Sequence, residues 1–256
     1  AGAAAPAPWH AESCHVMLGF PARTCTPAAY PRYSEDVHSP FKDYALMDKR
    51  LILFDFDGTI ANTIAQSLKI SNRLAGEFGY RRLDPTEVQT LRDKSLFELL
   101  HFMRVPFTKL PLILAKARNE MRNEITEVES IPGLQEVLGT LHQRGYRMGI
   151  LTTNSEENVR RFLAHHEIHA FDFIHSSSLI WGKHHGLKQI LKQERILPAE
   201  MVYIGDETRD IEAAQRAKIP IIAVGWGYNS KRVLRALQPD QFVELPSELL
   251  ALFPDA

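Results

Sequence analysis

Asp55 and Asp57 follow directly on a run of four apolar residues, Leu51–Phe54, and Gly58 comes next. The apolar run predicts a strand buried on both faces, and the glycine predicts a sharp exit from it. Side chains two positions apart in a strand point the same way, so both carboxylates are expected together at its carboxyl end. Mg²⁺, which prefers carboxylate oxygens and waters, would compensate their mutual repulsion. A solvated Asp-Gly turn is the alternative interpretation.

Other polar residues lie where predicted elements begin or end: Thr152 and Thr153 after a strand at 146–151, Lys183 at the start of a helix, and Asp206 with Asp210 after a strand at 201–204. The carboxyl ends of parallel strands meet at one edge of a sheet, so these groups are expected to converge. Carboxylates, a hydroxyl and an ammonium together suit phosphoryl transfer, which needs positioning and charge neutralisation. Taken singly, each also has a structural explanation: a solvated lysine, β-forming threonines, and aspartates at a helix N-terminus.

The elements that would position these residues alternate between strands and helices. After the first strand at 51–54, further strands are predicted at 146–151, 171–174, 201–204, 221–224 and 242–243. This alternation predicts a parallel sheet with helices on both faces. Residues 61–129 instead predict about four helices and no strand, which makes an all-helical insert.

Helix starts within and after the insert carry capping signals. Asp84 with Glu87, and Ser95 with Glu98, have the spacing of capping boxes. Asn154 is predicted to cap the helix that runs to about residue 165.

Composition bounds the classes of function. The chain has 256 residues, is 45% hydrophobic and 24% charged, and has a net charge of -1. These values are ordinary for a globular protein and give no electrostatic footprint for nucleic acid. No apolar run approaches the roughly 20 residues that span a bilayer, so no membrane partner is expected. Cys14 and Cys25 form no CxxC or zinc-type spacing, and the default expectation is a reduced, cytoplasmic protein.

Residues 1–46 are rich in Ala and Pro and lack any helical or strand period. They are predicted to be a disordered or irregular extension. One hypothesis is that the natural chain begins at Met47; the alternative is that the extension belongs to the protein. The expected division is therefore an extension at 1–46, an α/β core at 47–61 and 130–256, and a helical domain at 62–129.

Taken together and in order, these motifs resemble the haloacid dehalogenase superfamily, in its phosphatase branch with a helical cap. Its motifs stand here as Asp55-Phe56-Asp57-Gly58-Thr59, Thr153-Asn154, Trp181-Gly182-Lys183, and Gly205-Asp206 with Asp210. The similarity covers residues 51 to about 250, and the pattern is similar to phosphoglycolate phosphatases. It implies a doubly wound, Rossmannoid α/β core with an inserted helical cap. Asn62 departs from the pattern, because the family often has an acidic residue there.

The resemblance also implies roles for the carboxylates. Asp55 would be the nucleophile that forms an aspartyl-phosphate, and Asp57 would protonate the leaving oxygen and later activate water. Mg²⁺ would be held by the side chains of Asp55 and Asp206 and the backbone carbonyl of Asp57. Asp210 would orient Lys183 or a water on the metal.

The phosphate itself would be bound by Thr153 and Lys183, helped by backbone N–H groups near Gly58 and Asn154. In the cap, Arg92 and Lys94 could reach an anionic substrate, although a solvated charged loop is an equally good interpretation.

The expected function is Mg²⁺-dependent hydrolysis of a small phosphorylated metabolite. A phosphomutase acting on a sugar phosphate and a non-catalytic phospho-ligand sensor are the alternatives. Neither the ester nor an oligomeric state follows from the sequence.

Overall fold

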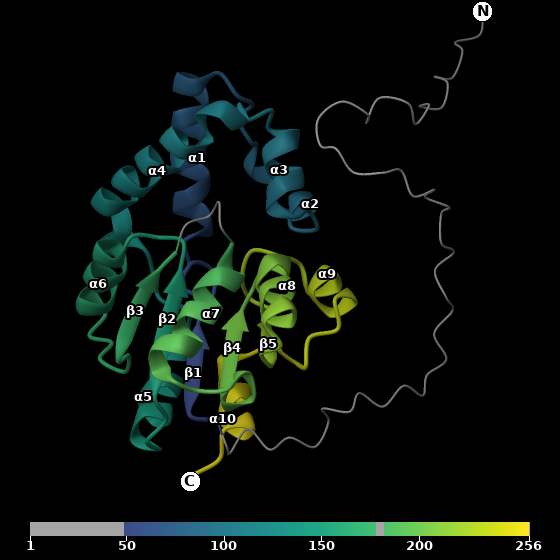
Figure 1. Ribbon diagram of the computed structural model, residues 1–256. Helices are drawn as coiled ribbons and strands as arrows, with labels where there is room; N and C mark the ends of the chain where they lie inside the picture. Colours follow the sequence, from purple (N-terminus) through teal and green to yellow (C-terminus); the bar gives the residue numbers. More distant parts are fainter. Residues whose placement is uncertain (1–48, 178–181, 256) are drawn as a thin grey trace, which may run out of the picture. The chain divides into compact units, whose positions relative to one another are not determined.

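The computed structural model describes residues 49–177 and 182–255 (Figure 1). The predictions for residues 1–46, Met47, the two cysteines and Trp181 lie outside the described residues.

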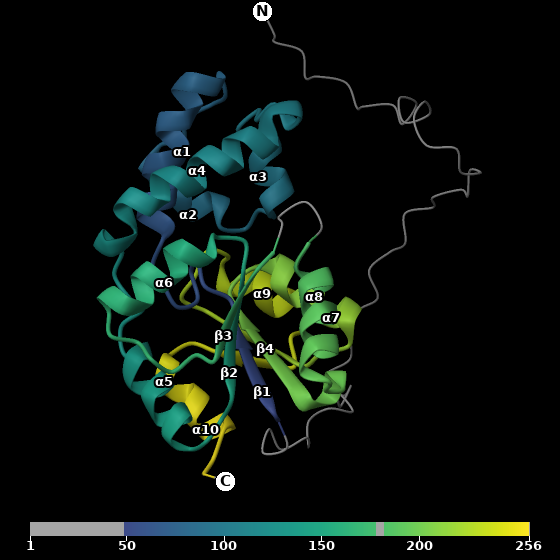
Figure 2. The same cartoon turned by 60° about the vertical axis from the view of Figure 1, so that its left-hand side comes forward.

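A parallel sheet of six strands forms the core, in the order β3-β2-β1-β4-β5-β6. The strands are β1 (Leu51–Phe54), β2 (Met148–Thr152), β3 (Phe173–Ser176), β4 (Met201–Gly205), β5 (Ile221–Val224) and β6 (Gln241–Val243). The central strand β1 pairs with both β2 and β4, so that Phe54 is in register with Ile150 and Ile204 (Figure 2). The predicted doubly wound α/β fold is confirmed. Because β1 lies between β2 and β4 in this parallel sheet, the carboxyl ends of these three strands lie next to each other.

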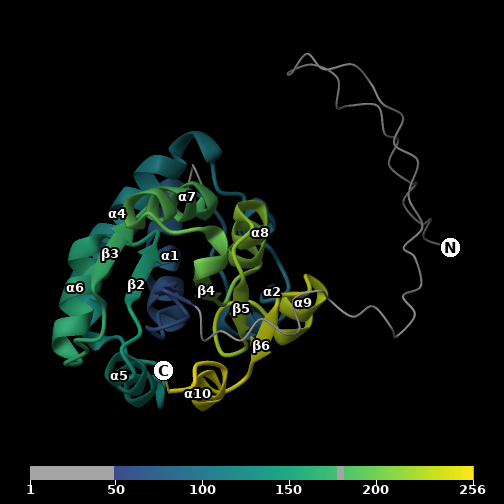
Figure 3. The same cartoon turned by 60° about the horizontal axis from the view of Figure 1, so that its bottom comes forward.

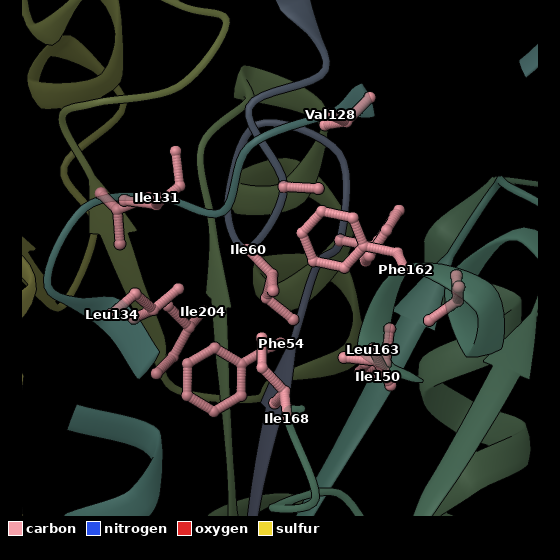
Figure 4. Packing of buried hydrophobic residues seen from close by; sticks show 14 of the residues in the cluster. Phe54, Ile60, Val128, Ile131, Leu134, Ile150, Phe162, Leu163, Ile168 and Ile204 are labelled. Carbon is pink, nitrogen blue, oxygen red and sulfur yellow. The ribbon is translucent and has the colours of Figure 1, made fainter. Parts of the chain in front are cut away.

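Helices cover both faces of this sheet, as the alternation predicted (Figure 3). On one face lie α5 (Leu134–Gln143), α6 (Glu156–His165) and α10 (Leu249–Leu252), and on the other α7 (Lys183–Glu194), α8 (Thr208–Ala217) and α9 (Lys231–Ala236). Successive β1 side chains alternate between the two apolar clusters, with Phe54 in the first and Leu53 in the second. Figure 4 shows Phe54 packed with Ile60 and Phe162 in the first cluster. Burial of β1 on both faces fixes the strand that carries Asp55.

The segment between β1 and β2 is helical, as expected. It comprises α1 (Ile64–Phe78), α2 (Val88–Leu91), α3 (Leu96–Phe102) and α4 (Leu110–Glu124), with 3₁₀ turns at Pro85–Glu87, Phe107–Lys109 and Ile125–Glu127. The long helices α1 and α4 lie side by side (Figure 1). Both capping boxes form: the Asp84 carboxylate accepts from the N–H of Thr86, and the Ser95 hydroxyl accepts from the N–H of Glu98. We call residues 62–129 the insert; its limits as a separate domain stay a prediction.

The two connections between the core and the insert run next to each other. The N–H of Asn62 donates to the carbonyl of Glu129 at 2.9 Å, and the N–H of Ile131 donates to the carbonyl of Ile60 at 2.9 Å. Ala61 forms bridges to both Asp57 and Ser130. The insert therefore begins and ends beside the Asp57 turn.

Several predicted element boundaries were wrong, and strand β2 starts at Met148, two residues later than expected. Strand β3 starts at Phe173, two residues later than expected, because Phe171 packs edge-on against Phe54 and the Asp172 carboxylate accepts from the N–H of Met148 before pairing begins. Helix α6 is capped by Ser155. Asn154, the predicted cap, instead directs its side chain toward the end of β1, as described below.

Among the described helices, none combines the length and the apolar character required to cross a bilayer.

Candidate active site

Lys183 is the buried centre of the site. It begins α7, is 3% exposed, and its Nζ lies 2.5 Å from Oδ2 of Asp55 and 2.5 Å from Oδ1 of Asp210. Burial lowers the pKa of this ammonium, but the charges of Asp210 and Asp55 outweigh it, and the pKa is raised. The residue therefore stays a cation between two carboxylates that come from β1 and α8.

Asp210 is held in place by several donors. Its Oδ1 accepts from the hydroxyl of Tyr203 at 3.0 Å and from Lys183, while its Oδ2 accepts from the N–H of Glu207 at 3.0 Å. Lys183, Tyr203 and Glu207 thus occupy both oxygens of this carboxylate. The orienting role expected for Asp210, on Lys183 or on a water at the metal, stays a prediction.

Asp55 follows β1 with its carboxylate 2% exposed. Its Oδ1 accepts from the N–H of Phe56 at 2.7 Å. Its Oδ2 accepts no hydrogen bond of acceptable geometry from the described residues, although the Lys183 ammonium is close. Burial raises the pKa of Asp55 to about 7, against the opposing effect of Lys183. A further cation at Oδ2 would favour the ionised, nucleophilic form of this carboxylate.

Asp206 follows β4 and is fully buried. Its Oδ1 accepts from the hydroxyl of Thr59 at 2.6 Å, and its Oδ2 accepts from the N–H of Tyr228 at 2.7 Å. Burial, and next the charge of Asp55, raise the pKa of Asp206 well above its ordinary value. The ionised form of this carboxylate therefore also needs a nearby cation.

Two glycines enclose the Asp206 carboxylate. A Cβ on Gly58 would lie 2.4 Å from Oδ2 of Asp206, and one on Gly227 would lie 2.1 Å from the same atom. Gly58 also has φ +81°, in the region that favours glycine. Neither position has room for a side chain, so the backbone closes tightly around this carboxylate.

The carboxylates fit a hard divalent cation. Asp55, Asp206 and Asp210 each offer an oxygen, and these atoms lie within 4.8 Å of one another. Their three negative charges face the single positive charge of Lys183, and oxygen donors of this kind suit Mg²⁺. Both oxygens of Asp206 and of Asp210 already accept hydrogen bonds, whereas Oδ2 of Asp55 accepts none from the described residues, so Asp55 offers the freest oxygen to a metal.

Asp57 lines a cavity. The side-chain amide of Asn154 donates to it, with Nδ2 3.2 Å from Oδ1 and 3.4 Å from Oδ2. Burial raises the pKa of Asp57, while hydrogen bonds from Thr63 and Asn154 oppose this effect. A carboxyl group with a raised pKa beside an open cavity is placed to hold and release a proton.

The two threonines after β2 have different environments. Thr152 is buried, and its hydroxyl accepts from the N–H of Asn154 at 2.9 Å. Thr153 is half-buried and lines the cavity together with Asp57 and Asn154. Thr153 is therefore the threonine that can meet a ligand.

Arg92 already has partners in the core. Its guanidinium donates to the carbonyls of Gly227, Tyr228 and Asn229, at 2.5, 3.1 and 3.4 Å. This side chain fastens the insert to the loop after β5. Lys94 lies with its Nζ 5.7 Å from the centre of the Phe102 ring. Both residues line the cavity.

The sequence analysis missed Arg118, a half-buried residue of α4. Its Nε donates to the carbonyl of Thr153 at 2.9 Å. Within the described chain its terminal nitrogens donate no hydrogen bond and form no ion pair. It lines the cavity with Asp57 and Asn154. Nothing in the local sequence marks it, because its position depends on how α4 packs over the end of β2.

Glu207 and Arg209 form a charged pair beside these residues. They form an ion pair at 2.5 Å and both line the cavity. Burial opposes the charged form of Arg209, but the carboxylates of Glu207 and Asp210 outweigh it and raise its pKa. The pair adds no net charge to the site.

The chain is similar to known proteins in sequence and in fold. The family described as haloacid dehalogenase-like hydrolase matches residues 52–224. A phosphoglycolate phosphatase of Synechococcus elongatus is 32% identical over 200 residues, covering 78% of this chain and 94% of the relative. A pyrophosphatase of Bacillus cereus is 27% identical, covering 80% of this chain and 96% of the relative. Among solved structures, a haloacid dehalogenase-like family hydrolase from Streptococcus pneumoniae has a TM-score of 0.69 at 24% identity, covering 81% of this chain and 99% of that one.

Proposed function

We propose that this chain, which belongs to the haloacid dehalogenase-like hydrolase family, is a Mg²⁺-dependent phosphatase that acts through an aspartyl-phosphate on Asp55. The family and its named relatives make the chain a phosphatase. The finer assignment rests on one observation: the Asp55 carboxylate lies 2.5 Å from the buried Lys183 ammonium, beside the cavity that Asp57 lines. The nucleophile, a cation for phosphate and a proton donor are thus within one site.

In the proposed first step, an oxygen of Asp55 attacks phosphorus and the P–O bond to the leaving alcohol breaks. Asp57 gives its proton to the alcohol oxygen as that bond breaks. In the second step Asp57 takes a proton from water, and the water oxygen attacks the phosphorus of the aspartyl-phosphate. Inorganic phosphate leaves, and both carboxylates return to their starting state.

The phosphate oxygens would be held from two sides. Lys183 and the hydroxyl of Thr153 would bind them from the core, with backbone N–H groups near Gly58 and Asn154. Arg118 would add its free terminal nitrogens from the insert, since these lie at the cavity beside Asn154. Charged donors of this kind give strong hydrogen bonds to phosphate.

Mg²⁺ is supported by the chemistry of the donor set. Asp55 and Asp206 would supply side-chain oxygens, and the backbone carbonyl of Asp57 would supply a third ligand. When bound, Mg²⁺ would neutralise charge on the carboxylates and on the phosphate. Asp210 would keep Lys183 oriented, as its contacts support.

Phosphate release from a panel of esters, with Mg²⁺ and with EDTA, tests this function. The panel includes phosphoglycolate, pyrophosphate, a sugar phosphate and p-nitrophenyl phosphate, because the named relatives differ in substrate. We expect release that requires the metal and that Asp55→Asn abolishes. Asp84→Asn is the matched control, since this exposed aspartate only caps a 3₁₀ turn and asparagine also caps well.

A rapid acid quench should trap a phosphoprotein that hydroxylamine cleaves, in the wild type but not in Asp55→Asn. Absence of phosphate release from every ester by the folded protein would refute the phosphatase function. Isomerisation of the sugar phosphate without phosphate release would favour a mutase.

A further inference from the structure

A cavity of about 430 Å³ leads from the candidate active site into the insert. This volume is within the range of sites that hold small-molecule ligands, roughly 300–1,000 Å³. Asp57, Thr153 and Asn154 line one end of it. The rest of the cavity is therefore placed to receive the part of the ester that lies beyond the phosphate.

The walls contributed by the insert are mainly apolar. Side chains of α1, α3 and α4 line the cavity, and those that keep part of their surface exposed include Ile64, Leu68, Leu96, Leu99, Leu100 and Leu114. Apolar surface left facing water is unfavourable, and a ligand that covers it gains binding free energy.

Polar side chains are the smaller part of the lining. Arg118 and Asn154 line the cavity near Thr153, Ser71, Gln89 and Lys94 line it from the insert, and Arg92 is fastened to backbone carbonyls. The hydroxyl of Ser67 is already paired with that of Tyr228 at 2.8 Å. Because apolar side chains make up most of the walls, a leaving group rich in hydroxyls or carboxylates would lose water at positions that offer it no partner, which disfavours sugars and small acids.

We infer that the preferred substrates are phosphate monoesters whose leaving group is apolar, an alkyl chain or a hydrophobic ring that extends into the insert. This inference rests on the proposed phosphatase function and names its substrate class. The reaction is hydrolysis: the P–O bond breaks, the phosphoryl group passes to Asp55 and then to water, and the alcohol leaves with the proton of Asp57.

A homologous series of esters tests the inference in the wild-type protein. We expect kcat/KM to rise from ethyl to butyl to hexyl phosphate, by about fourfold for each methylene that is buried. Hexyl phosphate should also exceed phosphoglycolate and the sugar phosphate. A flat or falling series, or a preference for phosphoglycolate, would overturn the apolar assignment while leaving the phosphatase function intact. Failure to hydrolyse any ester would overturn both.

Two leucines on the same helix provide a matched pair of variants. Leu114 lines the cavity, whereas Leu112, two residues earlier, is 60% exposed and does not. Leu114→Gln should lower kcat/KM for hexyl phosphate by about tenfold or more and change that for ethyl phosphate little. Leu112→Gln should change neither value, and equal effects of the two variants on hexyl phosphate would contradict the inference.

A filling variant tests the same cavity if Leu114→Gln does not fold. Leu68→Phe would occupy part of the space in front of α1. We expect it to shift the preference from hexyl toward shorter esters. An unchanged chain-length profile in the folded Leu68→Phe protein would mean that the leaving group does not enter this cavity.

Discussion

Replacement of Arg118 by alanine separates a substrate contact from a structural one, because the two ends of this guanidinium do different things. Its Nε donates to the carbonyl of Thr153, and its terminal nitrogens have no partner among the described residues. The hydrogen bond from Nε is part of the folded protein, whereas the terminal nitrogens remain available to a ligand. The variant should therefore lose both stability and catalysis, by amounts that can be measured independently.

The expected sizes follow from the geometry. Loss of the Nε hydrogen bond to Thr153 should lower the free energy of unfolding by about 1 kcal/mol. For a chain of this size that corresponds to a fall in Tm of about 2–4 °C. A charge-assisted hydrogen bond from Arg118 to phosphate is worth about 1.5–3 kcal/mol, so kcat/KM should fall by about 10- to 150-fold. Arg118→Lys should recover only part of this, since an ammonium cannot donate in two directions as the planar fork does.

Steady-state kinetics with the best ester of the panel, and thermal unfolding of the same samples, measure both effects. Arg122→Ala is the matched control, because Arg122 lies one turn further along α4 and pairs at the surface with Glu157 at 2.7 Å. Its kcat/KM should equal that of the wild type. If Arg118→Ala loses stability but keeps kcat/KM within twofold, Arg118 is only a tie between the insert and β2, and the reasoning is refuted.

Three further outcomes are expected. Mg²⁺ at about 100 times its Kd should stabilise the folded protein by about 2.7 kcal/mol and raise Tm by several degrees. EDTA or the variant Asp206→Asn should remove this shift in Tm. An equal shift in Asp206→Asn would exclude Asp206 as a metal ligand. Gly227→Ala places a methyl group 2.1 Å from an oxygen of Asp206, so it should abolish phosphate release and the Mg²⁺-dependent shift in Tm, whereas Gly139→Ala, with nothing within 4 Å of its added Cβ, should keep both. Ser95→Ala removes the hydroxyl that accepts from the N–H of Glu98. It should lower the free energy of unfolding, measured in urea, by about 1 kcal/mol without a change in kcat. An unchanged midpoint of the urea unfolding transition would show that this cap contributes nothing to stability.

Much of the site could be predicted because its signals are local. An apolar run that ends in Asp55 predicts a strand and the position of its carboxylate, and the same holds for Asp206 after β4. Lys183 starts a helix at the predicted residue. Parallel topology then brings these residues together, because the carboxyl ends of separate strands meet at one edge of the sheet. The structure accordingly places Lys183 against Asp55, 128 positions earlier in the numbering, without any sequence signal that links them directly.

The insert could be predicted as helical, but not in the way it meets the core. For Arg92 the sequence left two interpretations open, contact with an anionic substrate and a solvated charged loop. Its partners are three backbone carbonyls of the loop after β5. Every residue has a backbone carbonyl, so no pattern of side-chain types predicts which carbonyls will accept from Arg92. Arg118 was missed because the sequence shows only a polar residue within a predicted helix. The packing of α4 against Thr153 brings its side chain to the site. Contacts between segments that are distant in the sequence are set by tertiary packing, which local propensity does not encode.

The paired connections at Ala61 and Ser130 have a consequence for how such a chain can be rebuilt. These two residues form an antiparallel bridge, so the backbone leaves the core and returns to it at almost the same place. A segment whose ends already touch can be exchanged or shortened without stretching the core, since the cost of closing a loop grows only slowly with its length. The α/β sheet and its buried aspartates would keep their arrangement in such an exchange. Exchange of the insert beside Asp57 is therefore expected to alter the preference for the leaving group while Asp55, Asp57 and Lys183 stay in place, and it would also remove Arg118 from the phosphate.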